Sequence, residues 1–349
     1  MPAFREERVD EITHSRPGLQ RVRLANGDAA YAITDLVGEL SAGDRVVVNT
    51  TAVDLGLGTG GSHVVHVNLD RPAFETNGGG HVMKARYLSE QIDAGSWEED
   101  APPHDELPDL SDARVALCVL HSHLPAIAAA AVASGSPPPA FVMADHNALP
   151  LVLSDVVHEL RTKDLLAATV SAGQSFGGDI EAVNVASGVD AALRAGHRSI
   201  VVAGGPGHVG TGSALGFSAL DLAGHATTLR QLGADVALVV RASSEEARTR
   251  HREISHHTVH LLDLVPVALK VPVPVPPDGG PVVDHGWITS RGHEPALAQV
   301  ADVPAAFERF ELDVDTMGRR LGDDRLALAY LGAAASWLSE PPDRLDRLD

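Results

Sequence analysis

A glycine-rich loop is the part of this sequence best suited to hold an anion. It reads Gly204-Gly-Pro-Gly-His-Val-Gly-Thr-Gly212 and lies between an apolar run, 199–203, and a predicted helix over 214–232. Backbone N–H groups of such a loop can approach an anion at the start of a helix. The alternative is a purely structural loop, because it matches neither a useful register of G-x-G-x-x-G nor the Gly-Lys-Ser/Thr of a P-loop. The candidate ligand-binding residues are Gly205, Gly207, Gly210, Thr211, Gly212 and Ser213.

A second run combines arginine and histidine in an acidic protein. It reads Arg248-Thr-Arg-His-Arg-Glu-Ile-Ser-His-His-Thr258 and follows the apolar run 235–241. Arginine suits bidentate binding of anions, and histidine suits proton transfer or metal binding. We expect Arg250 and Arg252 to neutralise a bound anion, and His256 or His257 to move a proton. Ser255 would cap a helix that begins at His256. The alternative is a solvated basic turn that balances nearby carboxylates.

Two aspartates and a glutamine complete the candidate site. Asp145 follows the apolar run 140–144, while Gln174 and Asp179 lie in Ser171-Ala-Gly-Gln-Ser-Phe-Gly-Gly-Asp179. Asp145 or Asp179 would orient the catalytic histidine or bind Mg²⁺. Gln174 is a further candidate for contact with the ligand. Asp179 has an alternative role as the N-cap of a helix over 180–194. No H-E-x-x-H, paired cysteine motif or G-x-S-x-G occurs, so the sequence specifies no bound metal and no hydrolase triad.

Predicted strands and predicted helices alternate along the part of the chain that positions these residues. Nearly continuous apolar runs are predicted strands, and helical patterns follow them, which is typical of a parallel sheet covered on both faces. The carboxyl ends of parallel strands lie at one edge of the sheet, where ligands bind. The polar or glycine-rich loops that follow the five runs should therefore meet in one crevice. The predicted strands are 114–120, 140–144, 165–170, 199–203 and 235–241, with 265–271 as a further candidate.

The chain divides into segments of different pattern, and 349 residues predict more than one domain. Within residues 1–69, segments 19–25 and 29–34 alternate apolar and polar positions on either side of Asn26-Gly27-Asp28, and 46–48 and 63–69 are further predicted strands, which predicts a small all-β barrel or sandwich. Residues 70–111 form a connector. Residues 112–275 are the Rossmann-like parallel α/β domain that binds the ligand. Residues 276–349 are a C-terminal extension with a docked helix over 326–338.

Composition restricts the partners of the protein. The net charge of −20 repels phosphate backbones and argues against nucleic acid as a partner. No apolar run approaches the roughly 20 residues that cross a bilayer, and the N-terminus does not resemble a signal peptide. Cys118, the only cysteine, lies in an apolar run and is expected to be a buried thiol. We therefore expect a cytoplasmic protein with no membrane partner, and a homodimer only on general grounds.

Four motifs resemble an uncharacterised bacterial family, domain of unknown function 3866. They are Ala144-Asp-His-Asn-Ala-Leu-Pro-Leu, Ala172-Gly-Gln-Ser-Phe-Gly-Gly-Asp-Ile-Glu-Ala-Val-Asn, Gly205-Pro-Gly-His-Val-Gly-Thr-Gly and Arg250-His-Arg-Glu-Ile-Ser-His-His-Thr. Their order and spacing extend the resemblance over most of the chain. The family pattern favours small residues where this chain has His146-Asn147, so the resemblance assigns these two residues no role. It implies no substrate, cofactor or catalytic residue.

Two functions fit these features. The first is an enzyme that acts on a small anionic or phosphorylated metabolite in the crevice, and the concentration of ionisable groups beside the anion loop favours it. The second is a non-catalytic ligand sensor or regulatory protein whose N-terminal β domain contacts a partner, and the separate N-terminal pattern favours that reading. The sequence alone gives neither the substrate nor the reaction class.

Overall fold

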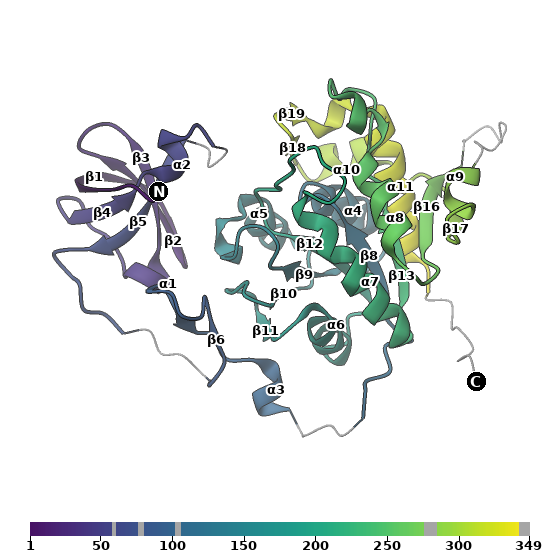
Figure 1. Cartoon of the computed structure of the whole chain (residues 1–349), viewed down its shortest axis with the longest axis horizontal. Coiled ribbons are helices and arrows are strands. Elements are labelled where there is room, and N and C mark those ends of the chain that lie inside the picture. Colours follow the sequence, from purple (N-terminus) through teal and green to yellow (C-terminus); the bar gives the residue numbers. More distant parts are fainter. Residues whose placement is uncertain (58–60, 76–79, 102–105, 276–284, 342–349) are drawn as a thin grey trace. The chain divides into compact units, whose positions relative to one another are not determined.

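The computed structural model describes residues 1–57, 61–75, 80–101, 106–275 and 285–341. The chain forms two compact units, Met1–Gly95 and Ser96–Asp349 (Figure 1). The first unit contains a closed β-barrel and the second contains a parallel sheet covered by helices. The predicted fold class, a parallel α/β domain with a small N-terminal barrel, is therefore confirmed.

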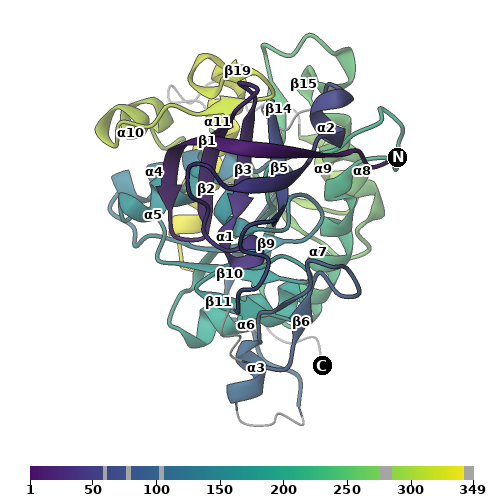
Figure 2. The same ribbon diagram turned by 90° about the vertical axis from the view of Figure 1, so that its left-hand side faces the viewer.

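The barrel has five strands in the order β1-β2-β3-β5-β4. β1 pairs with β2 on one side and β4 on the other, and Figure 2 shows it running across the barrel. The sequence pattern predicted no strand at β1, because most of its side chains are polar and exposed. Gly27 has a φ of 93° in the predicted turn between β2 and β3. The strands are β1 (Phe4–Arg16), β2 (Leu19–Leu24), β3 (Ala29–Ile33), β4 (Arg45–Asn49) and β5 (Ser62–Asn68).

The second unit is built on an eight-stranded sheet in the order β11-β10-β9-β12-β8-β13-β16-β17, and every neighbouring pair is parallel. The side chains of β8, β9 and β13 are all buried, which explains why their sequences are apolar except for Arg114 and Asp235, which pair with each other at 3.4 Å. The strands are β8 (Arg114–Cys118), β9 (Ala140–Ala144), β10 (Ala168–Ala172), β11 (Ile180–Ala182), β12 (Ser199–Gly204), β13 (Asp235–Val239), β16 (Lys270–Pro274) and β17 (Glu294–Ala298).

Two strands differ from the prediction. Residues Ile180–Ala182 form β11 where the sequence indicated the start of a helix, because they pair with β10 and the helix begins only after Asn184. Glu294–Ala298 forms β17, so the sheet continues into residues 276–349, which were predicted to be a C-terminal extension. Both strands lie at the ends of the sheet, where tertiary pairing outweighs a weak local pattern.

Helices cover both faces of the sheet. One hydrophobic cluster joins the sheet to α4 (His123–Ala133), α5 (Asp155–Thr162), α10 (Val303–Arg309) and α11 (Arg325–Ser339). The other joins it to α6 (Val185–Arg194), α7 (Leu222–Gln231) and α8 (His256–Leu264). Alanines fill much of α4 and α11, which pack closely against each other.

Short elements complete the described part of the chain. The four-residue helices are α1 (Thr34–Val37), α2 (Thr51–Asp54), α3 (Trp97–Asp100) and α9 (Gly286–Thr289). The small two-stranded sheets are β6 (Met83–Lys84) with β7 (Ile92–Asp93), β14 (Ala242–Ser243) with β15 (Glu253–Ile254), and β18 (Asp315–Thr316) with β19 (Arg319–Arg320). None of the described helices combines the length and hydrophobicity needed to span a bilayer.

The topology of the sheet determines where a ligand can bind. β8 and β12 are neighbours, but the chain leaves them in opposite directions: after β8 it continues through α4 to β9, and after β12 through α7 to β13. The two helices cover opposite faces of the sheet. In open α/β sheets, such a switch point opens a crevice at the carboxyl ends of the strands. A ligand site is therefore expected at the loops that follow β8, β12 and β13.

Candidate functional site

A cavity of about 110 Å³ lies beside the loops that follow β12 and β13. Three arginines and three histidines line it, and no carboxylate is among its described lining residues, although the chain carries a net charge of −20. We call it the arginine–histidine pocket. Its lining residues are His208, Gly210, Gly212, Arg241, Arg248, Arg250, His251, His257 and Met317.

The glycine-rich loop reaches the pocket as a tight hairpin. Gly210 pairs with Phe217, and the backbone N–H of Thr211 donates to the carbonyl of Gly216 over 2.7 Å. The hydroxyls of Thr211 and Ser213 lie 3.0 Å apart and bond within this turn. α7 begins only at Leu222, after a 3-10 turn over Ser218–Asp221, so the predicted helix start at residue 214 and the predicted placement of this loop at a helix N-terminus are wrong. The hairpin forms part of the pocket wall, and the positive charge of the pocket comes from the arginines.

His257 is fixed from three sides. The Ser255 side chain caps α8 by accepting the N–H of His257, so the predicted helix start at His256 is confirmed. The ring of Phe217 stacks on that of His257 with centroids 4.0 Å apart. Arg241 Nη1 lies 3.0 Å from His257 Nδ1. Arginine can only donate, so Nδ1 must accept and the ring proton of neutral His257 sits on Nε2.

His208 presents the complementary imidazole, whose ring centroid lies 5.2 Å from that of His257. Ser218 Oγ donates to Asn147 Oδ1 over 2.6 Å and accepts the Val209 N–H. Because its one proton is used, Ser218 Oγ can only accept from His208 Nδ1, 3.4 Å away. Nε2 of His208 then carries the lone pair, and this buried atom has no hydrogen-bond partner among the described residues. The pocket therefore contains a hydrogen-bond donor, Nε2–H of His257, and a hydrogen-bond acceptor, Nε2 of His208.

The pocket is positive because of its arginines, while its histidines are neutral. Burial first, and then the charge of Arg241, lowers the pKa of His208 to about 4 and that of His251 to about 3. The same two causes also place the pKa of His257 well below its usual range. Burial, followed by Arg248, lowers the pKa of Arg241 to about 10, so this arginine remains charged at neutral pH. The site therefore favours an anion.

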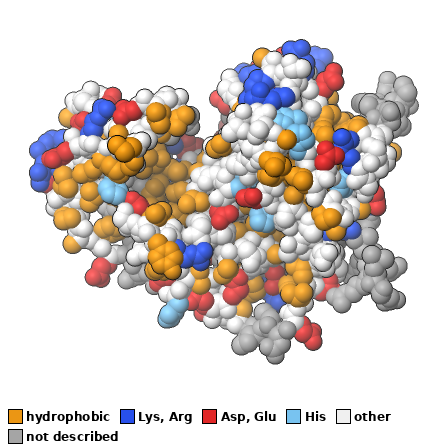
Figure 3. Space-filling model, viewed as in Figure 1, with side chains coloured by type: hydrophobic (Ala, Val, Ile, Leu, Met, Phe, Trp, Pro, Cys, Tyr) orange, Lys and Arg blue, Asp and Glu red, His pale blue; other side chains and the backbone are white. Residues whose placement is uncertain are grey.

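One carboxylate beside the pocket offsets part of this charge. Glu246 pairs with Arg248 at 2.8 Å and with Arg319 at 3.4 Å. The hydrogen bond from Arg248 is the main cause that holds the pKa of Glu246 far below its usual range. Figure 3 shows basic and histidine side chains gathered near the β18–β19 region on this face of the second unit. Arg241 and Arg250 have no ion pair with any described carboxylate and supply the uncompensated charge.

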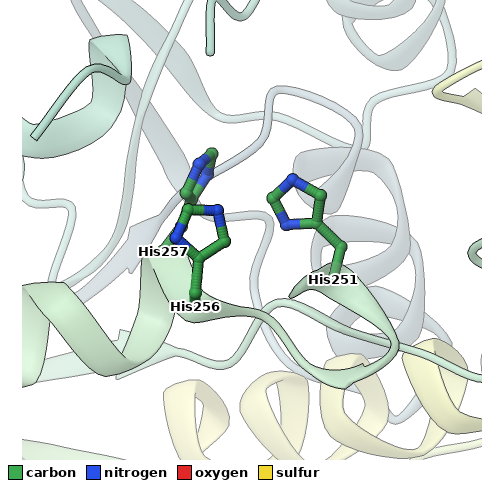
Figure 4. A group of neighbouring side chains, drawn as sticks. All are labelled: His251, His256 and His257. Carbon is green, nitrogen blue, oxygen red and sulfur yellow. The ribbon is translucent and has the colours of Figure 1, made fainter. Parts of the chain in front are cut away.

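Three imidazoles cluster next to the pocket. One ring nitrogen from each of His251, His256 and His257 lies within 4.8 Å of the other two, and Figure 4 shows the rings turned toward a common space. Ser255 Oγ lies 2.7 Å from Nδ1 of His251 and fixes that ring. Nε2 of His256 is buried and unpartnered among the described residues. Such a nitrogen set is suited to a transition metal.

The structure brings four of the predicted residues into the pocket: Gly210, Gly212, Arg250 and His257. His256 lies beside them in the imidazole cluster. Arg252 is exposed, is not among the lining residues and donates from Nε to the carbonyl of Glu246. Gly207 is exposed, and Gly205 is buried where an added Cβ would lie 2.5 Å from the Ala148 carbonyl oxygen. These two glycines do not line the pocket, and their role is in the conformation of the loop backbone.

The predicted acidic residues lie elsewhere. Asp145 accepts the N–H of Gln174 over 2.8 Å, which links the loops after β9 and β10. Asp179 immediately precedes β11, accepts the N–H of Thr169 and pairs with Arg161 at 3.1 Å. Because β11 runs parallel to β10, Asp179 lies at the amino ends of the strands, opposite the pocket. It does not cap α6 either, since Asn184 does so.

Sequence reasoning missed most of the charged lining. The sequence did not single out four of the lining residues as site residues: Arg241, Arg248, His208 and His251. Arg241 could have been identified from the sequence because it ends an apolar run. Charged residues are rarely buried without a binding partner, so an arginine at the end of a buried strand indicates a site. Met317 comes from the β18–β19 turn, far away in the sequence, and gave no signal.

Comparison with known proteins places the chain in a family. The family model described as "Protein of unknown function (DUF3866)" matches residues 29–335, which include all four motifs quoted above. Neither a curated protein nor a solved structure matches the chain. The chain therefore belongs to the DUF3866 family.

Proposed function

We propose that this protein is an enzyme that acts on a small anionic or phosphorylated metabolite in the arginine–histidine pocket. The observation that carries the proposal is the lining itself, with three arginines, three histidines and no described carboxylate around about 110 Å³. Arg241 is buried, Arg248 is half-buried and Arg250 is exposed. Keeping the buried guanidinium of Arg241 charged is costly unless a counter-charge occupies the site. A bound anion is the simplest counter-charge.

The size of the pocket limits what it holds. The cavity of about 110 Å³ has room for a phosphate or carboxylate group. Arg241 and Arg250 would contact this group as bidentate donors, with Arg248 shared between the anion and Glu246. The rest of the metabolite would extend out of the pocket.

The two imidazoles suggest the chemistry. His208 Nε2 would accept a proton from the substrate, and His257 Nε2–H would donate to the negative charge that develops. His208 is a weak base in the empty pocket, since burial and Arg241 lower its pKa to about 4. A bound dianion offsets the arginines and would raise that pKa toward neutrality. Proton transfer next to a bound anion is the reaction class we propose.

A second candidate function is a ligand sensor without catalysis. The compact unit Met1–Gly95 favours it, because a separate barrel can contact a partner. Under both functions the pocket binds an anion. They differ in the need for His208: a sensor with His208→Gln keeps its response to the anion, whereas the enzyme loses turnover. We further propose a cytoplasmic location, as expected from the sequence, and no nucleic-acid partner, because the net charge of −20 repels phosphate backbones.

A thermal-shift screen tests the proposal. It compares inorganic sulfate and phosphate, sugar phosphates, nucleotides and acyl-CoAs against the full chain. A ligand at about 100 times its Kd stabilises the folded state by about 2.7 kcal/mol, which raises Tm measurably. We expect phosphorylated or sulfated compounds to raise the Tm of the wild type and to raise the Tm of Arg250→Met clearly less at the same concentration. Equal shifts in both proteins would reject the pocket as the anion site.

A further inference from the structure

We propose that His251, His256 and His257 bind one divalent transition metal ion of the Zn²⁺ type at the side of the arginine–histidine pocket, with an open coordination position facing the anion. Imidazole nitrogen is a preferred ligand of Zn²⁺, whereas Mg²⁺ and Ca²⁺ require oxygen. No described carboxylate lines the pocket, which argues against the oxygen-binding ions.

The geometry is close to that of a three-histidine site. The three ligand nitrogens lie within 4.8 Å of one another. Zn–N bonds of about 2.0–2.1 Å in a tetrahedron place nitrogens roughly 3.4 Å apart, so the rings need to approach one another by at most about 1.4 Å. Nε2 of His256 is buried and lacks a described partner, and Ser255 holds Nδ1 of His251 as an outer-shell group does in metal sites.

Arg241 keeps His257 away from such a metal in the present state. Its N–H occupies the Nδ1 lone pair, and the proton on Nε2 blocks the other nitrogen. If Arg241 withdraws, either nitrogen can become the ligand without a change in net protonation, because the proton moves to the other one. Metal binding would thus release one N–H of Arg241 into the pocket. The metal and Arg241 compete for the same imidazole.

The surrounding charge couples the metal to the anion. A divalent ion beside Arg241, Arg248 and Arg250 is repelled, and Glu246 offsets only part of this charge. An anion in the pocket would remove the repulsion and supply a ligand for the open position. Metal and anion should therefore strengthen each other's binding by the same factor, as linkage requires. This coupling rests on the proposed function, whereas the three-histidine site does not.

The test measures Zn²⁺ affinity of the metal-free full chain by competition with a chromophoric chelator. We expect one ion per chain, and an affinity at least about 100-fold lower in His251→Ala and in His256→Ala. His158→Ala, an exposed histidine on α5, is the matched control and should not change the affinity. Arg241→Met should increase it. Wild-type affinity in both His251→Ala and His256→Ala would overturn the proposal.

Two further measurements do not depend on the folding of a variant. Co²⁺ bound to the wild type should give the strong visible absorption of a tetrahedral or five-coordinate ion, and the weak spectrum of an octahedral aqua-like ion would overturn the site. Saturating sulfate should raise Zn²⁺ affinity by about tenfold. Sulfate binding to the metal-free protein without Zn²⁺ binding rejects the metal site alone. Zn²⁺ binding without sulfate binding keeps the metal site and rejects the proposed function.

Discussion

Arg241 donates a hydrogen bond from Nη1 to Nδ1 of His257 over 3.0 Å, and both side chains are buried. This bond joins the loop after β13 to the first turn of α8, so it links two of the elements that form the pocket. It fixes the tautomer of His257 and leaves the remaining donors of Arg241 for a ligand. The chemistry proposed for this site depends on that relationship.

A large side chain at Gly210 should close the pocket without unfolding the protein. An added Cβ there would lie 3.5 Å from Cε1 of His257, which is ordinary contact, and the residue has no positive φ. Gly210→Ala should therefore bind sulfate, while Gly210→Leu should lose binding with an unchanged Tm. Ala214→Leu, exposed in the same hairpin, is the control. Sulfate binding by Gly210→Leu at wild-type affinity would place the anion elsewhere.

Ser255 should matter more than an ordinary helix cap. It is buried, caps α8 and lies 2.7 Å from Nδ1 of His251. Ser255→Ala removes the cap and leaves that nitrogen without a partner, so we expect it to lower the free energy of unfolding by about 2 kcal/mol. Asn184→Ala, an exposed cap on α6, should cost about 1 kcal/mol. Urea denaturation compares them, and equal losses would show that the His251 contact contributes nothing.

Acid should destabilise the protein through His121. Its Nδ1 donates to the carbonyl of Gly204 over 2.9 Å, and its Nε2 accepts from Ser154 over 2.7 Å, so the ring is neutral. Burial lowers its pKa in the folded state to about 4. The unfolded state therefore binds more protons below its ordinary pKa of about 6.5. The free energy of unfolding should fall between about pH 6.5 and pH 4, by up to about 3 kcal/mol from this group.

The variant His121→Gln isolates this contribution. Its amide can both donate and accept, and it does not titrate. Its unfolding free energy should depend less steeply on pH in this window, while His158→Ala should follow the wild type. Urea denaturation at several pH values measures the slopes. A wild-type slope in His121→Gln would assign the acid sensitivity to other groups.

The sequence was sufficient to predict the parallel sheet and the edge at which a site could form. Apolar runs such as Ala140–Ala144 are long enough and regular enough to identify buried strands, and the parallel arrangement then places their ends together. The start of α8 at His256 was also predictable, since Ser255 is a strong cap. Both features depend on neighbouring residues along the chain, so the local sequence was sufficient to predict them.

Contacts between distant segments explain what the sequence could not predict. Asp179 looked like a helix cap, but pairing of Ile180–Ala182 with β10 moves it to the amino ends of the strands. The hairpin between Gly210 and Phe217 depends on stacking of Phe217 against His257, which no local pattern encodes. Met317 reaches the pocket from a turn far away along the chain. Such partners are set by tertiary packing.

Isothermal titration of the metal-free protein with sulfate tests the central claim most directly, because sulfate remains a dianion throughout the neutral range. The wild type should bind one sulfate per chain, and each of Arg241→Met and Arg250→Met should weaken binding by about 10- to 100-fold, as expected for the loss of a charge-assisted hydrogen bond. Arg252→Met, which alters an exposed arginine outside the pocket lining, should bind like the wild type. No saturable binding by the wild type, or equal binding by all four proteins, would contradict the account.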